Sequence, residues 1–284
     1  MASKVDLHVH TTASDGRLTP EEIVQRAAEQ ELTYLAITDH DTVAGIERAL
    51  RVCAAFPNLT LIPGLEINTD TQTGEVHILG YCIDYKHRNL NVSLDQLRHS
   101  REIRARKIVD NLSGMGIDVS WERVMELAGG GSVGRPHIAQ AMFEGGHIPS
   151  LQEAFIKYIG RHGPAYAERE RISPEEAVQL VVMAGGLPVL AHPEDVDELD
   201  SFLSSLKQAG LVGMETYYNG YHRDTINKLV KTAERYGLIT TGGSDFHGLG
   251  SSHETPLGGV EVPIECAEGL LSLAGRRESE EMSS

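Results

Sequence analysis

Short apolar runs alternate with amphipathic stretches along the chain. Seven short runs of six to nine residues are apolar and strand-like, and they are separated by amphipathic helical stretches. They occupy residues 5–10, 33–39, 59–67, 75–83, 187–192, 212–218 and 238–245. Alternation of strands and helices is typical of a mostly parallel sheet wrapped by helices, and about seven strands permit a barrel.

Two helix N-termini can be recognised between the predicted strands. Thr19 precedes Pro20 and Ser173 precedes Pro174, which predicts crossover helices beginning at the two prolines. Residues 91–171 break the alternation with helical segments at 92–116 and 134–146. The chain is therefore divided into a barrel (1–90 and 172–275), a helical insertion domain that caps the substrate (91–171) and a polar, disordered tail (276–284).

Composition narrows the class of protein. The 284 residues are 40% hydrophobic and 23% charged, which is ordinary for a globular chain, and no apolar run approaches the ~20 residues that cross a bilayer. The formal charge of −16 argues against long nucleic acid but allows a small anionic substrate if metal ions supply positive charge. Three cysteines without metal-type spacing and no secretory pattern at the start predict a cytoplasmic protein with no membrane partner.

Histidines and carboxylates recur where the predicted strands end. His8 and His10 are two residues apart, so on a strand both side chains point to one face. A single histidine at a strand end is usually an ordinary hydrogen-bonded residue, but six histidines and several carboxylates in equivalent positions predict a metal centre at the carboxyl ends of the strands. The later members are Asp39, His40, Glu66, His77, His192, Asp245 and His247.

Nitrogen and oxygen ligands without thiolate suit Zn²⁺, Mn²⁺ or Fe²⁺. The number of donors predicts more than one ion, and a carboxylate such as Glu66 can bridge two. An ion lowers the pKa of its bound water to about 7, and two ions ~3.5–4 Å apart stabilise the attacking and leaving oxygens of a displacement at phosphorus. Phosphoester hydrolysis is the natural reaction, with carbonyl hydrolysis as the alternative.

The segments HVH, Asp15, TDH, GLE, EVH, AHP and SDFH resemble, in this order, the PHP (polymerase and histidinol phosphatase) family. The resemblance implies a distorted seven-stranded (β/α)7 barrel with two or three divalent ions, Mn²⁺ first, with Zn²⁺ or Fe²⁺ as alternatives, and it favours phosphate over carbonyl chemistry. It assigns His8, His10, Glu66 and Asp245 to one ion, Glu66, His77 and His192 to a second, and Asp15, His40 and His247 to a third. Many family members have histidine where this chain has Asp15, which leaves the affinity and metal preference of the third site open. The alternative for Asp15, in the segment TTASDGR, is an ordinary Asp–Gly turn residue.

Substrate contacts are predicted in the insertion and at the barrel rim. In GGGSVGRPHIAQA, Arg135 and His137 stand where a helix begins, which suits a phosphate, with a glycine linker as the alternative. Tyr218 and Asn219 are predicted to contact a base or sugar, or else to pack in the barrel wall. The basic run from Arg98 to Lys107 is predicted to be a solvated helix face.

The RPHIA segment resembles the branch of the family that removes phosphate from nucleoside 3′,5′-bisphosphates or trims RNA from a 5′-phosphorylated end. The acidic composition favours the smaller ligand. The predicted activity is hydrolysis of the 3′-phosphate of a compound such as adenosine 3′,5′-bisphosphate to the 5′-monophosphate, by attack of a metal-bound hydroxide. The alternatives are a 5′–3′ exoribonuclease on short RNA, a histidinol phosphate phosphatase, and a non-catalytic metal-binding module; the complete donor set argues against the last.

Overall fold

The computed structural model describes residues 4–71, 74–169, 172–250 and 254–281. Seven strands form one sheet in sequence order: β1 (Val5–Asp6), β2 (Tyr34–Ile37), β3 (Thr60–Asp70), β4 (Glu75–Tyr81), β5 (Leu187–Leu190), β6 (Gly213–Tyr218) and β7 (Ile239–Gly243). The first and last strands also meet, because Leu7 N donates to Gly242 O at 3.1 Å and Asp245 N donates to His8 O at 2.9 Å. The sheet is therefore the nearly closed barrel that the sequence predicted.

Strand direction differs from the prediction at one position. β4 runs antiparallel to β3 and to β5, whereas the other neighbouring strands are parallel. Only four residues separate Asp70 from Glu75, and so short a connection joins antiparallel strands. The expectation that every candidate residue follows a parallel strand is thus wrong for His77, which lies near the start of β4. Because β4 is reversed, its start lies at the same rim as the ends of the parallel strands.

β1 is shorter than the predicted strand 5–10. Its ladder ends at Asp6, and Val9 forms only an isolated bridge with Phe246. The reason is local: Val9 N donates to the side-chain oxygen of Thr38 at 3.0 Å instead of to a strand carbonyl. His8 and His10 therefore lie in extended backbone beyond the ladder.

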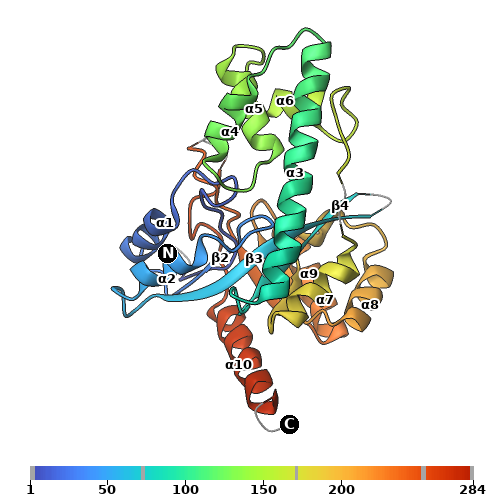
Figure 1. The fold of residues 1–284 in the computed structure, drawn as a ribbon. Helices are drawn as coiled ribbons and strands as arrows, with labels where there is room; N and C mark the ends of the chain where they lie inside the picture. The colour runs from blue at the N-terminus through green and yellow to red at the C-terminus, as the bar shows by residue number, and fades with distance from the viewer. Residues whose placement is uncertain (1–3, 72–73, 170–171, 251–253, 282–284) are drawn as a thin grey trace.

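Helices surround the barrel (Figure 1). They are α1 (Pro20–Glu29), α2 (Ile46–Cys53), α7 (Pro174–Met183), α8 (Leu199–Ala209) and α9 (Arg223–Tyr236), with a 3₁₀ turn, η2 (Pro193–Asp195). Both predicted helix starts are confirmed, since Thr19 with Glu22 and Ser173 with Glu176 form capping boxes. None of the helices within the described residues is both long and apolar enough to cross a membrane.

A helical segment separates β4 from β5. It contains α3 (Arg88–Gly114), α4 (Trp121–Ala128), α5 (Arg135–Glu144), α6 (Leu151–Ala154) and the π-helix η1 (Phe155–Ile159). Figure 1 shows α3 rising from the barrel to the far end of this segment, with α4, α5 and α6 gathered around its outer half. The outer half has its own hydrophobic cluster, drawn from residues 105–167, while Leu90 and Leu94 at the base of α3 pack with the barrel.

The last helix, α10 (Ile264–Glu281), packs against β7 and lies at the end of the molecule opposite the helical segment (Figure 1). Cys266, Ala267 and Leu270 join a cluster with Leu79 and Tyr81, which are two and four residues from His77 and so share its face of β4. The prediction of a disordered tail from residue 276 is wrong as far as Glu281. Arg277 donates to Gly186 O at 3.1 Å, and this contact fixes the last turns of the helix to the barrel.

Candidate metal centre

Glu66, in the middle of β3, lies at the centre of the predicted donor set and is 1% exposed. Its two carboxylate oxygens face different histidines. Oε2 lies 3.4 Å from His8 Nε2, 3.3 Å from His10 Nε2 and 2.9 Å from His40 Nδ1. Oε1 lies 2.7 Å from His77 Nδ1 and 3.3 Å from His192 Nε2. One carboxylate thus stands between two groups of imidazoles, as a bridging ligand would.

Asp245 joins the group around His8 and His10. Its Oδ1 lies 3.4 Å from His8 Nε2 and 3.0 Å from His10 Nε2, while Tyr218 donates its hydroxyl proton to Oδ2 at 2.7 Å. His192 and Asp245 both have positive φ, 25° and 54°. Such backbone is strained for residues other than glycine and is concentrated at functional sites.

A further group surrounds Asp15. His247 Nε2 lies 3.4 Å from Asp15 Oδ1 and His40 Nε2 lies 3.8 Å from Oδ2. Asp39 holds this turn in place, because it accepts hydrogen bonds from Thr11 N and from Ser14 Oγ at 2.7 and 2.6 Å. Asp15 is buried and faces the histidines, unlike an ordinary solvent-exposed turn residue.

The donor atoms fit a cluster of cations. Three sets have ligand atoms within 4.8 Å of one another: His10, Asp15, His40 and His247; His8, His10 and Glu66; His40, Glu66 and His77. Among the described residues, several of these atoms are buried with no hydrogen-bond partner, including His8 Nε2, both ring nitrogens of His10 and Glu66 Oε2. Buried polar atoms are rarely left unsatisfied, so these unpartnered donors fit a site for several metal ions.

Charge is unevenly divided over the imidazoles. Burial, with the nearby His247 and His40, lowers the pKa of His10 to about 3, so this ring is neutral and ready to bind a cation. Burial also opposes charge on His77, but Glu66 outweighs it and raises the pKa of His77 to about 9. In turn, His40 and His77 overcome the effect of burial on Glu66 and hold the pKa of its carboxyl well below the usual range.

Glu215 belongs to the site but was missed from the sequence. It is fully buried at the middle of β6, with Oε1 3.0 Å from His8 Nδ1 and Oε2 accepting from His192 N at 2.9 Å. A carboxylate behind a metal-binding histidine fixes the ring and its tautomer. The signal was present, since an acidic residue inside an otherwise apolar strand, GMETYY, has to be paired.

The basic run on α3 is solvated only in part: Arg106 and Lys107 are exposed as predicted, but the prediction is wrong for Arg101 and Arg104. Arg101 and Arg104 are each 4% exposed. They form a buried arginine cluster with two further side chains, Arg135 and Arg169. Arginines at a three-residue spacing share one helix face, and here that face is covered by the barrel rim and by the segment that leads back to β5.

Arg101 in this cluster is tied to the metal centre. It donates to Asp41 Oδ2 at 2.6 Å and to the side-chain oxygen of Asn68, whose amide nitrogen lies 2.6 Å from His77 Nε2. Arg169 donates to the same oxygen of Asp41 at 3.1 Å. These cations overcome burial and lower the pKa of Asp41 to about 2.

Among the described residues, Arg104 forms no ion pair with a carboxylate like that of Arg101 with Asp41, although Glu75 lies near enough to favour its charge. Within the described part of the chain its Nη1 atom is buried without a hydrogen-bond partner. Burial, together with repulsion from Arg169, Arg135 and Arg101, lowers the pKa of Arg104 to about 8. A bound anion would offset that repulsion and accept a hydrogen bond from Arg104 Nη1.

The remaining predicted substrate residues lie around the rim. Arg135 donates to Glu75 Oε2 at 2.8 Å, and His137 Nδ1 accepts from Gly134 N at 2.9 Å at the start of α5. Tyr218 is 5.2 Å from His192, centroid to centroid. Asn219 accepts a hydrogen bond from the hydroxyl of Thr255 through its side-chain oxygen.

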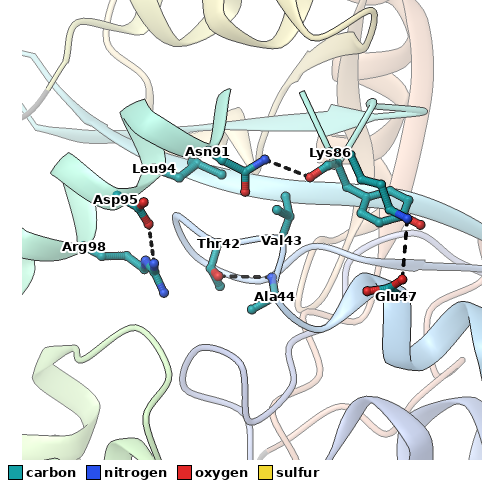
Figure 2. Close-up of a pocket in the computed structure, with 10 residues that line it drawn as sticks. Thr42, Val43, Ala44, Glu47, Lys86, Asn91, Leu94, Asp95 and Arg98 are labelled. Carbon is teal, nitrogen blue, oxygen red and sulfur yellow. Dashed lines mark hydrogen bonds and ion pairs between the residues drawn. The ribbon is translucent and has the colours of Figure 1, made fainter. Parts of the chain in front are cut away.

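A separate hollow of about 370 Å³ lies between the loop after β2 and the base of α3. Figure 2 shows its charged side chains paired with one another: Arg98 with Asp95, and Lys86 with Glu47 at 3.5 Å. Because its charges are already neutralised, this hollow is a weaker candidate site for a phosphate than the arginine cluster.

A barrel whose rim gathers this many imidazole and carboxylate donors is typical of a metal-dependent hydrolase. The chain belongs to the PHP domain family, whose sequence profile matches residues 6–163. It is 36% identical over 255 residues to "5′-3′ exoribonuclease Rnm" from Salmonella typhimurium, covering 85% of this chain and 84% of the relative. It is 32% identical over 253 residues to "3′,5′-nucleoside bisphosphate phosphatase" from Chromobacterium violaceum, covering 87% and 88%. A crystal structure from Bifidobacterium adolescentis, described as that of a candidate metal-dependent phosphoesterase, has a TM-score of 0.87 at 29% identity and covers 96% of both chains.

Proposed function

We propose that this enzyme hydrolyses the 3′-phosphate of nucleoside 3′,5′-bisphosphates. The observation that supports this most is the position of the arginine cluster. Arg104 Nη1 is a buried donor without a partner among the described residues, and Asn68 connects the same cluster to His77. A substrate with two phosphates can place one on the arginines and the other at the metal donors. The name of the Chromobacterium violaceum relative supports the same substrate class.

The proposed metal ligands follow the three donor groups: His8, His10, Glu66 and Asp245; Glu66, His77 and His192; Asp15, His40 and His247. Mn²⁺ is proposed first, with Zn²⁺ or Fe²⁺ as alternatives. The ions would supply a water of lowered pKa and positive charge for the phosphoryl oxygens. Glu66 and Glu215 hold the imidazoles in place for this task.

In the proposed reaction a water oxygen bonds to phosphorus, the bond from phosphorus to O3′ breaks, and O3′ gains a proton. Arg104 and Arg101 would hold the 5′-phosphate, which does not react, and so fix the distance to the scissile phosphate. Arg135 is a weaker anchor than predicted from the sequence because Glu75 already neutralises it. Tyr218 donates to Asp245, so it orients that carboxylate and is not free to contact the base through the same proton.

A second candidate is 5′–3′ trimming of short RNA, the activity in the name of the Salmonella typhimurium relative. The chemistry is the same: phosphorus is attacked and O3′ leaves. The two substrates differ in one of the oxygens on phosphorus that does not leave: it is unesterified in the bisphosphate and is O5′ of the next nucleoside in RNA. The net charge of −16 favours the smaller substrate over a longer polyanion. The sequence has three cysteines without metal-type spacing, so the reducing cytoplasm is the proposed compartment.

The test compares three substrates with the Mn²⁺-loaded protein: adenosine 3′,5′-bisphosphate, adenosine 3′-monophosphate and a 5′-phosphorylated oligoribonucleotide. Phosphate release and nucleotide release are both measured. The proposal expects the highest kcat/KM for the bisphosphate. A higher value for the oligonucleotide would make RNA trimming the main activity, and equal, feeble rates on all three would refute both candidates.

A further inference from the structure

A cavity of about 590 Å³ lies between the barrel rim and the helical segment. Asp15 and His247, from the third donor group, form part of its lining. Six of the other lining residues are apolar: Leu127, Pro136, Ala139, Leu151, Phe155 and Leu249. Its volume is within the range of small-molecule sites, and it adjoins the centre to which the proposed function assigns the chemistry.

Two charged side chains of this cavity, Glu144 and Arg17, already have hydrogen-bond partners. Glu144 accepts from Arg123 Nε at 2.8 Å through one oxygen and from Gln140 Nε2 at 2.8 Å through the other. Arg17 donates to Gln140 Oε1. The cavity therefore attracts a phosphate much less than the arginine cluster does, and its apolar walls suit an uncharged, flat part of a ligand.

Phe155 is the aromatic side chain in the lining, and its backbone is unusual. It opens the π-helix η1, where Gly160 N donates to Phe155 O at 3.0 Å, five residues back. Short π-helical turns are rare and often occur at functional sites. Phe155 is only half-buried, and the guanidinium carbon of Arg135 lies 5.9 Å from its ring centroid. The ring is thus held between the arginine cluster and the cavity.

We propose that this cavity binds the nucleobase of the substrate, stacked on Phe155. The proposal deepens the proposed function and rests on it for the identity of the ligand. With the 5′-phosphate on the arginine cluster and the scissile phosphate at the metal donors, the base is the remaining large group of a nucleoside bisphosphate. It is planar and uncharged, and every base has a face that stacks on an aromatic ring.

Binding is measured by calorimetry, independently of turnover, with two ligands that share the 5′-phosphate: adenosine 5′-monophosphate and ribose 5-phosphate. The wild-type protein is expected to bind the nucleotide more tightly. Phe155→Ala should weaken nucleotide binding by about tenfold or more, since base–aromatic stacking contributes about 1–3 kcal/mol, and should leave ribose 5-phosphate binding unchanged. Ile156→Ala is the matched control, because the neighbouring side chain is 77% exposed and does not line the cavity.

A second variant fills the cavity without removing a core side chain. Gln152 is an exposed lining residue, and Gln152→Trp should weaken nucleotide binding selectively. Equal affinity of the wild-type protein for both ligands, or equal effects of Phe155→Ala on both, would overturn the base site. A protein that shows base-dependent binding but releases no phosphate from the bisphosphate would retain the base site and refute the proposed function.

Discussion

Arg101 Nε, on α3, lies 2.6 Å from Asp41 Oδ2, just beyond β2, and both side chains are at most 5% exposed. Arg169 donates to the same carboxylate oxygen from the segment that returns to the barrel. Asp41 therefore holds both ends of the helical segment against the rim that carries the metal donors. Two guanidinium groups depend on one buried carboxylate.

Asp41→Asn should strongly destabilise the protein. The substitution leaves two buried cations without their counter-ion, and removing one partner of a buried ion pair costs about 3–5 kcal/mol. The free energy of unfolding is measured with urea in the presence of a chelator, so that metal binding does not contribute. Asp95→Asn is the control, because that exposed carboxylate pairs with Arg98 at the surface and should change stability by less than about 1 kcal/mol.

The same pair predicts a pH dependence. The pKa of Asp41 is about 2 in the folded protein and about 3.9 in an unfolded chain, so the folded state binds this proton less tightly. Its contribution to stability is present above about pH 4 and is lost as the pH falls toward 2. The difference in unfolding free energy between the wild type and Asp41→Asn should therefore shrink over this range. A difference that stays constant from pH 7 to pH 2.5 would contradict the assignment.

Arg104→Gln should raise KM for adenosine 3′,5′-bisphosphate by about ten- to a hundredfold, since a hydrogen bond to a charged group contributes about 1.5–3 kcal/mol. KM for adenosine 3′-monophosphate, which lacks the 5′-phosphate, should not change. Arg106→Gln on the same helix is the control, because its guanidinium lies over Trp121, 4.5 Å from the ring centroid, on the exposed side. An equal loss on both substrates would indicate that Arg104 supports the fold instead of the 5′-phosphate.

Strand periodicity made a barrel plausible and predicted the gathering of donors at one rim, and the family resemblance implied the seven-stranded barrel. Residues that end successive strands of a closed sheet must meet at one rim, so His40 and Asp245 could be placed together across about 200 intervening residues. The direction of β4 could have been inferred from its short link to β3. The prediction of a parallel strand there followed instead from the alternation of strands and helices in the rest of the chain.

The arginine cluster was harder to predict for a physical reason. The α3 run REIRARK has the composition of a solvated face, and only tertiary packing decides that Arg101 and Arg104 are covered while Arg106 is exposed. The role of Asp41 was also not predicted from the sequence, because Asp41 adjoins His40 in a segment that was interpreted as a metal-binding motif. Whether a charged residue on a helix is solvated can be decided only when the elements that pack against that helix face are known.

Glu215→Gln should weaken metal binding by about ten- to a hundredfold, the usual effect of losing a group that orients a metal ligand. Glu215 accepts with both oxygens, from His8 Nδ1 and from His192 N, and an amide has only one oxygen to offer. One of these contacts must be lost and the ring of His8 becomes less well fixed. Mn²⁺ affinity is measured by titration calorimetry, with the exposed Glu234→Gln as the control; equal affinities would exclude an orienting role.

His10→Ala separates metal binding from folding. Without metal, the substitution removes a buried ring whose Nε2 lies 3.0 Å from Asp245 Oδ1, so the Tm of each metal-free protein is taken as its own baseline. The increase above that baseline on adding metal should differ between the two. An ion at a hundred times its dissociation constant stabilises a protein by about 2.7 kcal/mol, so the wild type should gain a clear increase in Tm on adding Mn²⁺.

His10→Ala should lose most of that increase, bind less metal by elemental analysis and lose phosphatase activity, whereas the exposed His99→Ala should behave as wild type. A metal-induced increase in Tm that survives in His10→Ala would mean that the ions bind elsewhere and that the donor set around Glu66 does not hold them.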